Sequence, residues 1–187
     1  MRTACLVVLC CCLMACATEP QADLRSQPPA RSTPAPPAVP EGFEGTVEAT
    51  EKEAPSSPGS ATLAKVRTAP HPGFDRVVFE FQEGPLPGYR VEYLAETARQ
   101  CGSGDEVRTE GGGQILVRFH TAQAHTEEGH PTVAERERRP GLPILKEAKL
   151  MCDFEGYVDW VLGVSTRQPY RVMELSEPPR LIVDVRY

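Results

Sequence analysis

Apolar and polar residues alternate along four short segments beyond residue 70. The segments read FDRVVFEF at residues 74–81, GYRVEYL at 88–94, QILVRFH at 114–120 and RLIVDVRY at 180–187. Successive side chains of a strand point to opposite sides, so this alternation is typical of a β-strand with one buried face. Each segment is therefore predicted to bury its apolar positions, which are Val77, Phe79, Phe81, Tyr89, Val91, Tyr93, Ile115, Val117, Phe119, Leu181, Val183, Val185 and Tyr187.

Glycine and proline separate these segments, in stretches such as HPGFD, EGPLPG, EGGGQ and SEPPR. Such stretches favour turns. Short strands at this spacing predict an all-β fold over residues 61–187, an antiparallel β-sandwich or barrel. Little helix is expected, at most a turn or two at residues 94–100, where LAETARQ contains good helix formers.

A fifth segment, residues 150–164, follows the same alternation. Its even positions are apolar apart from Gly156, while its odd positions from 153 to 159 carry three carboxylates and Tyr157. The even positions, including Cys152 and Phe154, are therefore predicted to face the core. Gly156 is expected to mark a bulge, a bend or a tight connection.

The first residues have the pattern of a signal peptide. Arg2 precedes an apolar run at residues 4–14 that is too short to span a membrane as a mature helix. The run ends in LMAC, with Leu13, Ala15 and Cys16 placed as in the lipobox of bacterial lipoproteins, which it resembles. The resemblance implies a signal peptide at residues 1–15 and a lipidated Cys16, carrying a diacylglyceryl group with acyl chains such as palmitate. Ordinary secretion with cleavage nearby, or an uncleaved anchor, are the alternatives.

Residues 16–60 have the composition of a linker. Nine prolines and seven acidic residues occur between residues 17 and 60, with few bulky apolar side chains. Such a segment buries too little surface to offset its ordering entropy. We expect a disordered tether between the lipidated Cys16 and a domain at residues 61–187.

Only two cysteines remain in the predicted domain. Of the seven in the chain, four lie in the signal peptide and Cys16 is the expected lipidation site, which leaves Cys101 and Cys152. Exported proteins favour disulfides, so these two are predicted to be bonded. The alternative is that Cys152 is a small buried apolar side chain.

Several classes of function find no support in the sequence. The net charge is -6 and no stretch concentrates Lys and Arg, so we expect no nucleic-acid partner. GxSxG, HExxH and phosphate-loop motifs are absent. A nucleophilic Cys101 in CGSGD, or a metal site built from His120, His125 and His130, is a distant alternative. We expect no enzyme activity, no metal and no cofactor.

The outward positions of the predicted strands carry charges of both signs. Such side chains most often pair across strands on a solvated face. The alternative is that this face, or the long loop at residues 121–143, contacts a ligand. The candidate ligand-binding residues on the face are Arg76, Arg90, Arg118, Asp153, Glu155 and Asp159.

Five ordered motifs resemble the AMIN-like domains of bacterial lipoproteins, relatives of the AMIN domain of cell-wall amidases and secretins. They read HPGFDRVVFEF, PGYRVEYL, GGGQILVRF, CDFEG followed by VLGV, and PYRVMELSEPPRLIVDV, and the likeness runs from about Leu63 to Tyr187. The resemblance implies a β-sandwich without catalysis of its own, which targets envelope proteins by binding peptidoglycan or a partner. It assigns no ligand residue by position.

Together these features predict a non-catalytic, lipid-anchored binding module of the cell envelope that contacts peptidoglycan. The alternative is an assembly lipoprotein that binds a protein partner and has no affinity for glycan. A metal-dependent hydrolase is a distant third. The expected location is extracytoplasmic, on a bacterial membrane, and Ala17 and Thr18 after Cys16 resemble outer-membrane sorting if the cell has two membranes.

Overall fold

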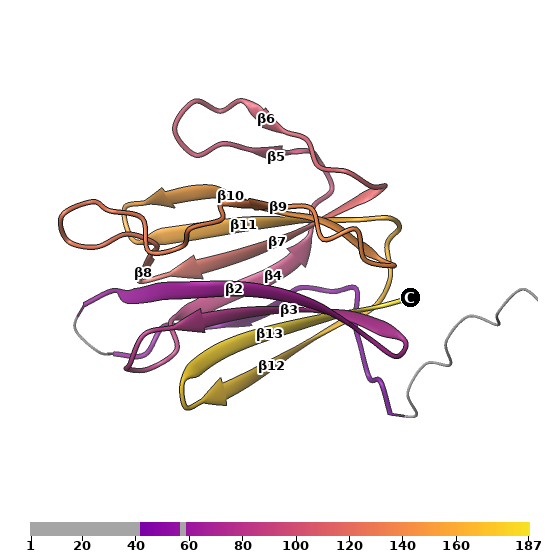
Figure 1. The fold of residues 1–187 in the computed structure, drawn as a ribbon, viewed down its shortest axis with the longest axis horizontal. Coiled ribbons are helices and arrows are strands. Elements are labelled where there is room, and N and C mark those ends of the chain that lie inside the picture. Colours follow the sequence, from indigo (N-terminus) through magenta and orange to yellow (C-terminus); the bar gives the residue numbers. More distant parts are fainter. Residues whose placement is uncertain (1–41, 57–58) are drawn as a thin grey trace, which may run out of the picture. The chain divides into compact units, whose positions relative to one another are not determined.

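Eleven of the thirteen strands in the described part of the chain form two β-sheets that pack face to face (Figure 1). The computed structural model describes residues 42–56 and 59–187, and that part of the chain contains no helix. The six-stranded sheet has the order β1 (Thr50–Lys52), β4 (Gly88–Tyr93), β7 (Gly113–His120), β11 (Tyr157–Val164), β10 (Leu145–Phe154) and β9 (Glu137–Arg138). The five-stranded sheet has the order β12 (Tyr170–Ser176), β13 (Pro179–Arg186), β3 (Phe74–Phe81), β2 (Ala61–His71) and β8 (Ala122–Gln123). The predicted all-β sandwich is confirmed.

Neighbouring strands are antiparallel, except that β2 and β8 run parallel. The predicted signal peptide, Cys16 and the tether as far as residue 41 lie outside the described residues. Among the residues that are described, no helix is long and apolar enough to cross a membrane.

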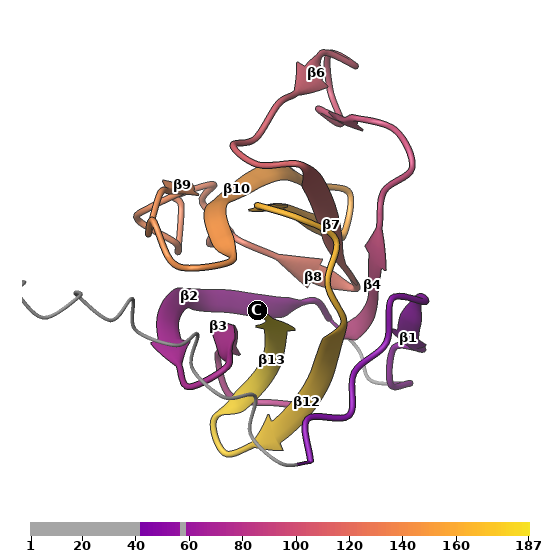
Figure 2. The same ribbon diagram turned by 90° about the vertical axis from the view of Figure 1, so that its right-hand side faces the viewer.

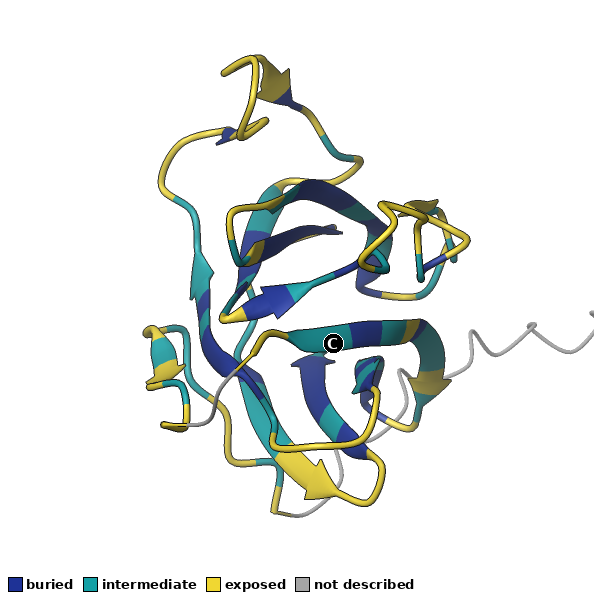
Figure 3. Cartoon of the chain, turned by 90° about the vertical axis from the view of Figure 1, so that its left-hand side faces the viewer, coloured by how far each residue is buried: buried dark blue, intermediate teal, exposed yellow. Residues whose placement is uncertain are grey.

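The core lies between the two sheets, where the alternating apolar positions meet. Figures 2 and 3 show the two layers and the buried residues that line the space between them. Trp160 is fully buried, with its ring centroid 5.9 Å from that of Phe79, which lies 5.2 Å from Phe119. Both pairs meet edge to face, a favoured aromatic arrangement. Because the inner faces fill this core, a ligand has access only to the outer faces, the edges and the loops.

The described residues include a segment that precedes the predicted domain. Residues 42–56, which composition assigns to the linker, form an N-terminal strap that contacts both sheets. Its strand β1 pairs with β4, and the backbone of Thr46 exchanges two hydrogen bonds with Tyr170 of β12. The hydroxyl of Tyr170 lies 2.6 Å from the carbonyl oxygens of Glu48 and Val91. The strap therefore belongs to the fold, although too few apolar residues mark it in the sequence.

The predicted short helix at residues 94–100 is wrong. Residues 98–99 form β5 (Ala98–Arg99), which pairs with β6 (Glu106–Val107) in a hairpin arm over the outer face of the six-stranded sheet. Ala98 and Val107 pack there against Leu116, Met151 and Val161, and the side-chain oxygen of Gln114 accepts the N–H of Ala98. These tertiary contacts outweigh the helix propensity of a short segment.

The predicted inward direction of Cys152 and Phe154 is also wrong. A β-bulge in β10 adds one residue between Leu150 and Cys152, so Leu150 pairs with Trp160 but Cys152 pairs with Asp159. Beyond the bulge the alternation is reversed, because one extra residue shifts every later side chain to the other face. Phe154 consequently lies on the outer face and is 61% exposed. Gly156 is not the bulge; it lies in the tight turn that joins β10 to β11.

Candidate binding surface

A row of side chains crosses the outer face of the six-stranded sheet. The register aligns one residue from each of β1, β4, β7, β11 and β10, in the order Glu51, Arg90, Arg118, Asp159 and Cys152. Adjacent strands lie about 4.8 Å apart, so the row spans roughly 19 Å. Three of the predicted ligand-binding residues, Arg90, Arg118 and Asp159, therefore share one face.

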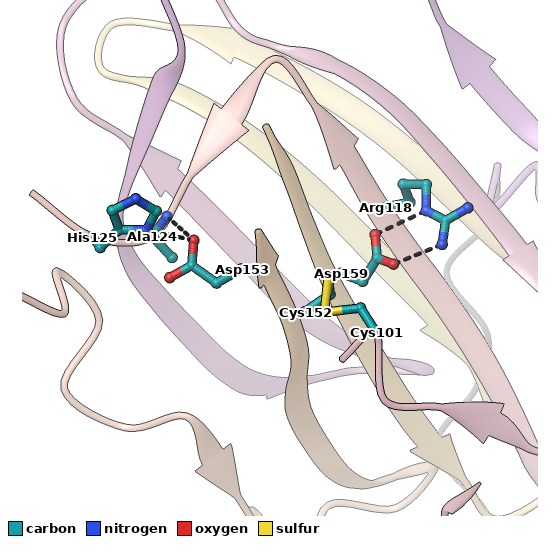
Figure 4. The surroundings of a disulfide bond; sticks show 7 residues. All are labelled: Cys101, Arg118, Ala124, His125, Cys152, Asp153 and Asp159. Atoms are coloured by element: carbon teal, nitrogen blue, oxygen red, sulfur yellow. Dashed lines mark hydrogen bonds and ion pairs between the residues drawn. A yellow bond between two sulfur atoms is a disulfide. The ribbon is translucent and has the colours of Figure 1, made fainter. Parts of the chain in front are cut away.

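Arg118 and Asp159 form a bidentate ion pair at the centre of this row (Figure 4). Nε donates to Oδ1 over 2.9 Å and Nη2 donates to Oδ2 over 2.7 Å. Asp159 is buried, whereas the Arg118 side chain is 44% exposed. The hydrogen bonds to Asp159 raise the pKa of Arg118 above its usual value. The carboxylate thus fixes the guanidinium while Nη1, which has no partner among the described residues, can donate to a ligand.

Arg90 is engaged more completely. Its guanidinium bonds both oxygens of Glu92, over 2.8 and 2.9 Å, and also contacts Glu51. Two carboxylates on a solvated surface therefore compensate this one cation. Exposed pairs of this kind stabilise a fold little, and Arg90 has less donor capacity for a ligand than Arg118.

Two exposed aromatic side chains lie beside the Arg118–Asp159 pair, at the tip of the β10–β11 hairpin. Phe154 and Tyr157 face each other across the strands and are 61% and 48% exposed. The two residues between them, Glu155 and Gly156, have φ of 48° and 80°, the signs required in a type I′ hairpin turn. Glutamate adopts positive φ uncommonly. The turn presents both rings to solvent, with the Arg118 guanidinium 5.8 Å from the Tyr157 ring centroid.

Cavities lie on both sides of the disulfide next to this tip. Cys101 and Cys152 are bonded, with their Cα atoms 5.3 Å apart, so the β5–β6 arm is attached to β10 (Figure 4). A cavity of about 250 Å³ is lined by the disulfide, Arg118, Asp159 and the tip residues 154, 155 and 157. A second, of about 530 Å³, is lined by the disulfide, Phe154, Asp153, Arg136 and the arm. Phe154 lines both cavities. We call Arg118, Phe154, Glu155, Tyr157 and Asp159, with these cavities, the tip surface.

Asp153 does not lie on the outer face. After the bulge it pairs with Val158, and its carboxylate is only 7% exposed. Oδ1 accepts the N–H of Ala124 over 2.9 Å and lies 2.8 Å from Nδ1 of His125 (Figure 4). Arg136 contacts Oδ2 over 3.3 Å. Asp153 thus fastens the long loop at residues 121–143 to the end of β10.

Arg76 lies on the other sheet, on the outer face of β3. It forms a bidentate pair with Asp184, over 2.7 and 2.9 Å, and Arg171 bonds the same buried carboxylate over 2.9 Å. Phe74 of β3 and Phe43 of the strap cover these cations, with the Arg171 guanidinium 4.5 Å from the Phe43 ring centroid. The structure therefore separates Arg76 from the other candidates.

Asp75 is a buried carboxylate that the sequence analysis missed. It follows the inward alternation of Val77 and Phe79, which was the available signal. Its Oδ2 accepts the N–H groups of Ile144 and Leu145, over 2.7 and 2.9 Å, and so joins β3 to the start of β10. Burial raises the pKa of Asp75, and the two N–H donors partly oppose that shift. Its Oδ1 has no hydrogen-bond partner among the residues that the structure describes.

The three histidines of the metal hypothesis occupy different positions. His120 covers Gly88 on the outer face at the end of β7, His125 bonds Asp153, and His130 lies exposed in the loop. Among the described residues, no group of three or more His, Cys, Asp or Glu side chains is placed to hold a metal ion.

Comparison with known proteins bears on the family of this sandwich. A model of the AMIN-like domain matches residues 61–187, which is more than half of the chain. The chain belongs to the AMIN-like family. No curated protein and no solved structure matches it. The matched AMIN-like domain contains the whole tip surface, whereas the N-terminal strap precedes it.

Membership places the protein in a general class. AMIN-like domains are in general non-catalytic binding modules of the cell envelope with a relation to peptidoglycan. The structure supplies a candidate binding surface for such a module. The tip surface combines exposed aromatic rings, a fixed guanidinium and two cavities on one face.

Proposed function

We propose that this protein is a non-catalytic, lipid-anchored module that binds peptidoglycan through the tip surface. The observation that carries the proposal is the position of Phe154 and Tyr157. They are two of the three exposed large apolar side chains in the described part of the chain, and they lie side by side against the cavities at the disulfide. Apolar rings with a few fixed polar groups are the usual lining of a ligand site.

The chemistry of the tip surface matches that of peptidoglycan. The flat rings of Phe154 and Tyr157 offer apolar faces to the C–H groups of sugar rings, and the Tyr157 hydroxyl offers a polar handle. Arg118 presents free N–H groups that suit the carboxylates of stem peptides. The bulge, the hairpin turn and the disulfide hold these groups on strands, which reduces the ordering cost of binding.

Sedimentation with purified sacculi tests this function. With all chains assayed at submicromolar concentration, the Phe154→Ala/Tyr157→Ala variant should lose most of its pelleting, whereas Leu175→Ala should pellet like the parent chain. Leu175 is a matched control, because it is the third exposed large apolar side chain and lies on the five-stranded sheet. Thermal unfolding of each variant controls for stability.

If the parent chain does not pellet above a control protein, the proposal of glycan binding is wrong. The same exposed rings suit a protein interface, where buried aromatic side chains dominate affinity. The assembly-lipoprotein alternative then takes its place, with the tip surface as the contact.

The anchor rests on Cys16 and the lipobox that it resembles. Metabolic labelling with a palmitate analogue should mark the parent chain and leave a Cys16→Ser variant unlabelled. Labelling of Cys16→Ser at the level of the parent would refute Cys16 as the lipidation site. In a cell with two membranes we expect the protein at the outer membrane.

A further inference from the structure

Strand β12 forms an open edge of the five-stranded sheet. On its free side, the only backbone partner in the described part of the chain is Thr46, which bonds both the N–H and the C=O of Tyr170. In a strand, alternate residues direct these groups to the same side. Val172, Glu174 and Ser176 therefore direct their N–H and C=O groups away from β13, toward solvent.

The backbone of this edge has little protection against pairing. Proteins commonly protect such strands with proline, with lysine or with a covering segment. Residues 171–176 read RVMELS, without proline or lysine. The strap bonds the backbone of the edge only at Tyr170, while its side chains Phe43 and Lys52 contact the side chains of Arg171 and Glu174. The outer face of the strand is apolar at Met173 and Leu175, and Leu175 is 43% exposed.

We propose that β12 pairs antiparallel with β12 of a second copy of this chain, across a twofold axis at Glu174. Val172 then lies opposite the partner's Ser176, and Met173 lies opposite the partner's Leu175. The pairing joins the two five-stranded sheets into one continuous sheet. It uses the backbone groups that the fold leaves open and a surface distinct from the tip surface.

Complementary side chains favour this register. With the axis at Glu174, the Met173–Leu175 contact forms twice on one face. Cross-strand pairs of apolar residues stabilise a sheet. With the axis at Met173, Leu175 would instead lie opposite the partner's Arg171, which loses both apolar contacts.

The length of the open edge also fits. Thr46 occupies the edge at Tyr170, and β12 ends at Ser176, where the chain turns toward β13 at Pro179. The five residues 172–176 of each copy therefore have no backbone partner on this side within the described part of the chain. Three open residues on each strand allow six backbone hydrogen bonds across the axis.

The two Glu174 side chains would face each other at the axis, but each is compensated within its own chain. Oε2 of Glu174 lies 2.5 Å from Nζ of Lys52, and Oε1 accepts the Tyr89 hydroxyl over 2.9 Å. The Lys52 ammonium therefore offsets the repulsion between the carboxylates. An edge of this length buries less area than a standard interface, so the association is weak and reversible.

Sedimentation velocity of the full chain carrying Cys16→Ser, from roughly 5 to 500 µM, tests the pairing in the range expected for a weak interface. The parent chain should shift from monomer to dimer over this range. Leu175→Lys, which places a charge against the partner's Met173, should remain a monomer. Leu175→Met keeps the apolar contact and should dimerise like the parent. A parent chain that stays monomeric at the highest concentration overturns the proposal.

Cross-linking tests the register separately from folding. In the proposed dimer, a Met173→Cys chain mixed with a Leu175→Cys chain should form a mixed disulfide under mild oxidation, identified by peptide mapping. Either variant alone should cross-link several-fold less through its new cysteine. Dimers that persist in Leu175→Lys without the mixed disulfide would show another interface and refute the β12 pairing. Sacculus binding by the tip surface is a separate measurement, so either proposal can fail alone.

Discussion

The outer faces of the two sheets contain the same ion pair in different surroundings. On the five-stranded sheet, Asp184 is shared by Arg76 and Arg171, and Phe74 and Phe43 cover the guanidinium groups. On the six-stranded sheet, Asp159 has one arginine partner among the described residues, Arg118, and the neighbouring aromatic rings of Phe154 and Tyr157 are exposed. Both faces therefore have a bidentate arginine–aspartate pair, but the aromatic rings beside it cover the arginines on the five-stranded face and are exposed on the six-stranded face.

This difference separates a structural cluster from a candidate binding surface. On the five-stranded face, the rings of Phe43 and Phe74 stack on arginines of the same chain, so these arginines are less available to a ligand. On the six-stranded face, the hairpin turn and the bulge direct the rings to solvent, next to cavities at the disulfide. A bidentate Arg–Asp pair alone therefore does not identify a binding site.

The largest expected loss of stability follows from removing the Cys101–Cys152 disulfide of the six-stranded face. Replacing both Cys101 and Cys152 by serine removes a cross-link between residues 51 apart. The free energy of unfolding should fall by about 4 kcal/mol in the chain-entropy model. Urea denaturation measures it, and mass spectrometry after thiol blocking, with and without reductant, checks the bond itself. Alkylation of both cysteines before reduction would contradict the disulfide.

Removing the carboxylate of each ion pair should have the next largest effect, and the loss of stability should differ between the two faces. Asp184→Ala leaves two guanidinium groups without a partner in a covered cluster and should cost about 3 kcal/mol of unfolding free energy. Asp159→Ala leaves one exposed guanidinium and should cost about 1 kcal/mol. The same denaturation series measures both variants. Equal losses would show that the cover makes no energetic difference.

Removing one aromatic ring from each face should show the same contrast with a smaller loss of stability. Phe43→Ala removes a partly buried ring that stacks on Arg171 and should lower stability by about 1 to 2 kcal/mol. Phe154→Ala removes an exposed ring and should change stability by less than about 0.5 kcal/mol. Melting temperatures compare the two. A larger loss for Phe154→Ala would assign that ring to the fold.

Stability measured over a pH series tests the protonation of Asp75, which is buried between these faces. The pKa of Asp75 is raised in the folded state, mainly by burial, so the folded chain holds this proton more tightly than the unfolded chain. The stabilising contribution is complete below the unfolded value near 3.8 and is lost as the pH rises through the folded value. Relative to Asp75→Asn, the parent should therefore lose stability as the pH rises above 3.8. A constant difference between the two chains would contradict the raised pKa.

Alternation predicted most of the fold because it reports directly which side chains reach the core. It placed Val77, Val117 and Val183 correctly, and all three are fully buried. It failed at residue 152, since a bulge inserts one residue without any local marker, and Met151 is as apolar as its neighbours. It also missed the strap, whose order depends on contacts with Tyr170 and β4, distant in the sequence.

The candidate site was predictable only in part. Arg118 and Asp159 were placed together on one face, as the register confirms. Phe154 was assigned to the core, so the exposed aromatic pair could not be foreseen before the bulge was seen. The cavities depend on the arm, where no strand was predicted and at most a helical turn or two was expected at residues 94–100. Arg76 was grouped with the others because alternation defines a face of one sheet and does not assign strands to sheets.

The most direct test of the two-face account is a titration with soluble peptidoglycan fragments, followed residue by residue in ¹H–¹⁵N NMR spectra. The account predicts shifts at residues 118, 154–157 and 159, and none at residues 76, 171 and 184. Shifts centred on Arg76 and Asp184, or saturating binding that leaves the tip surface unchanged, would contradict it.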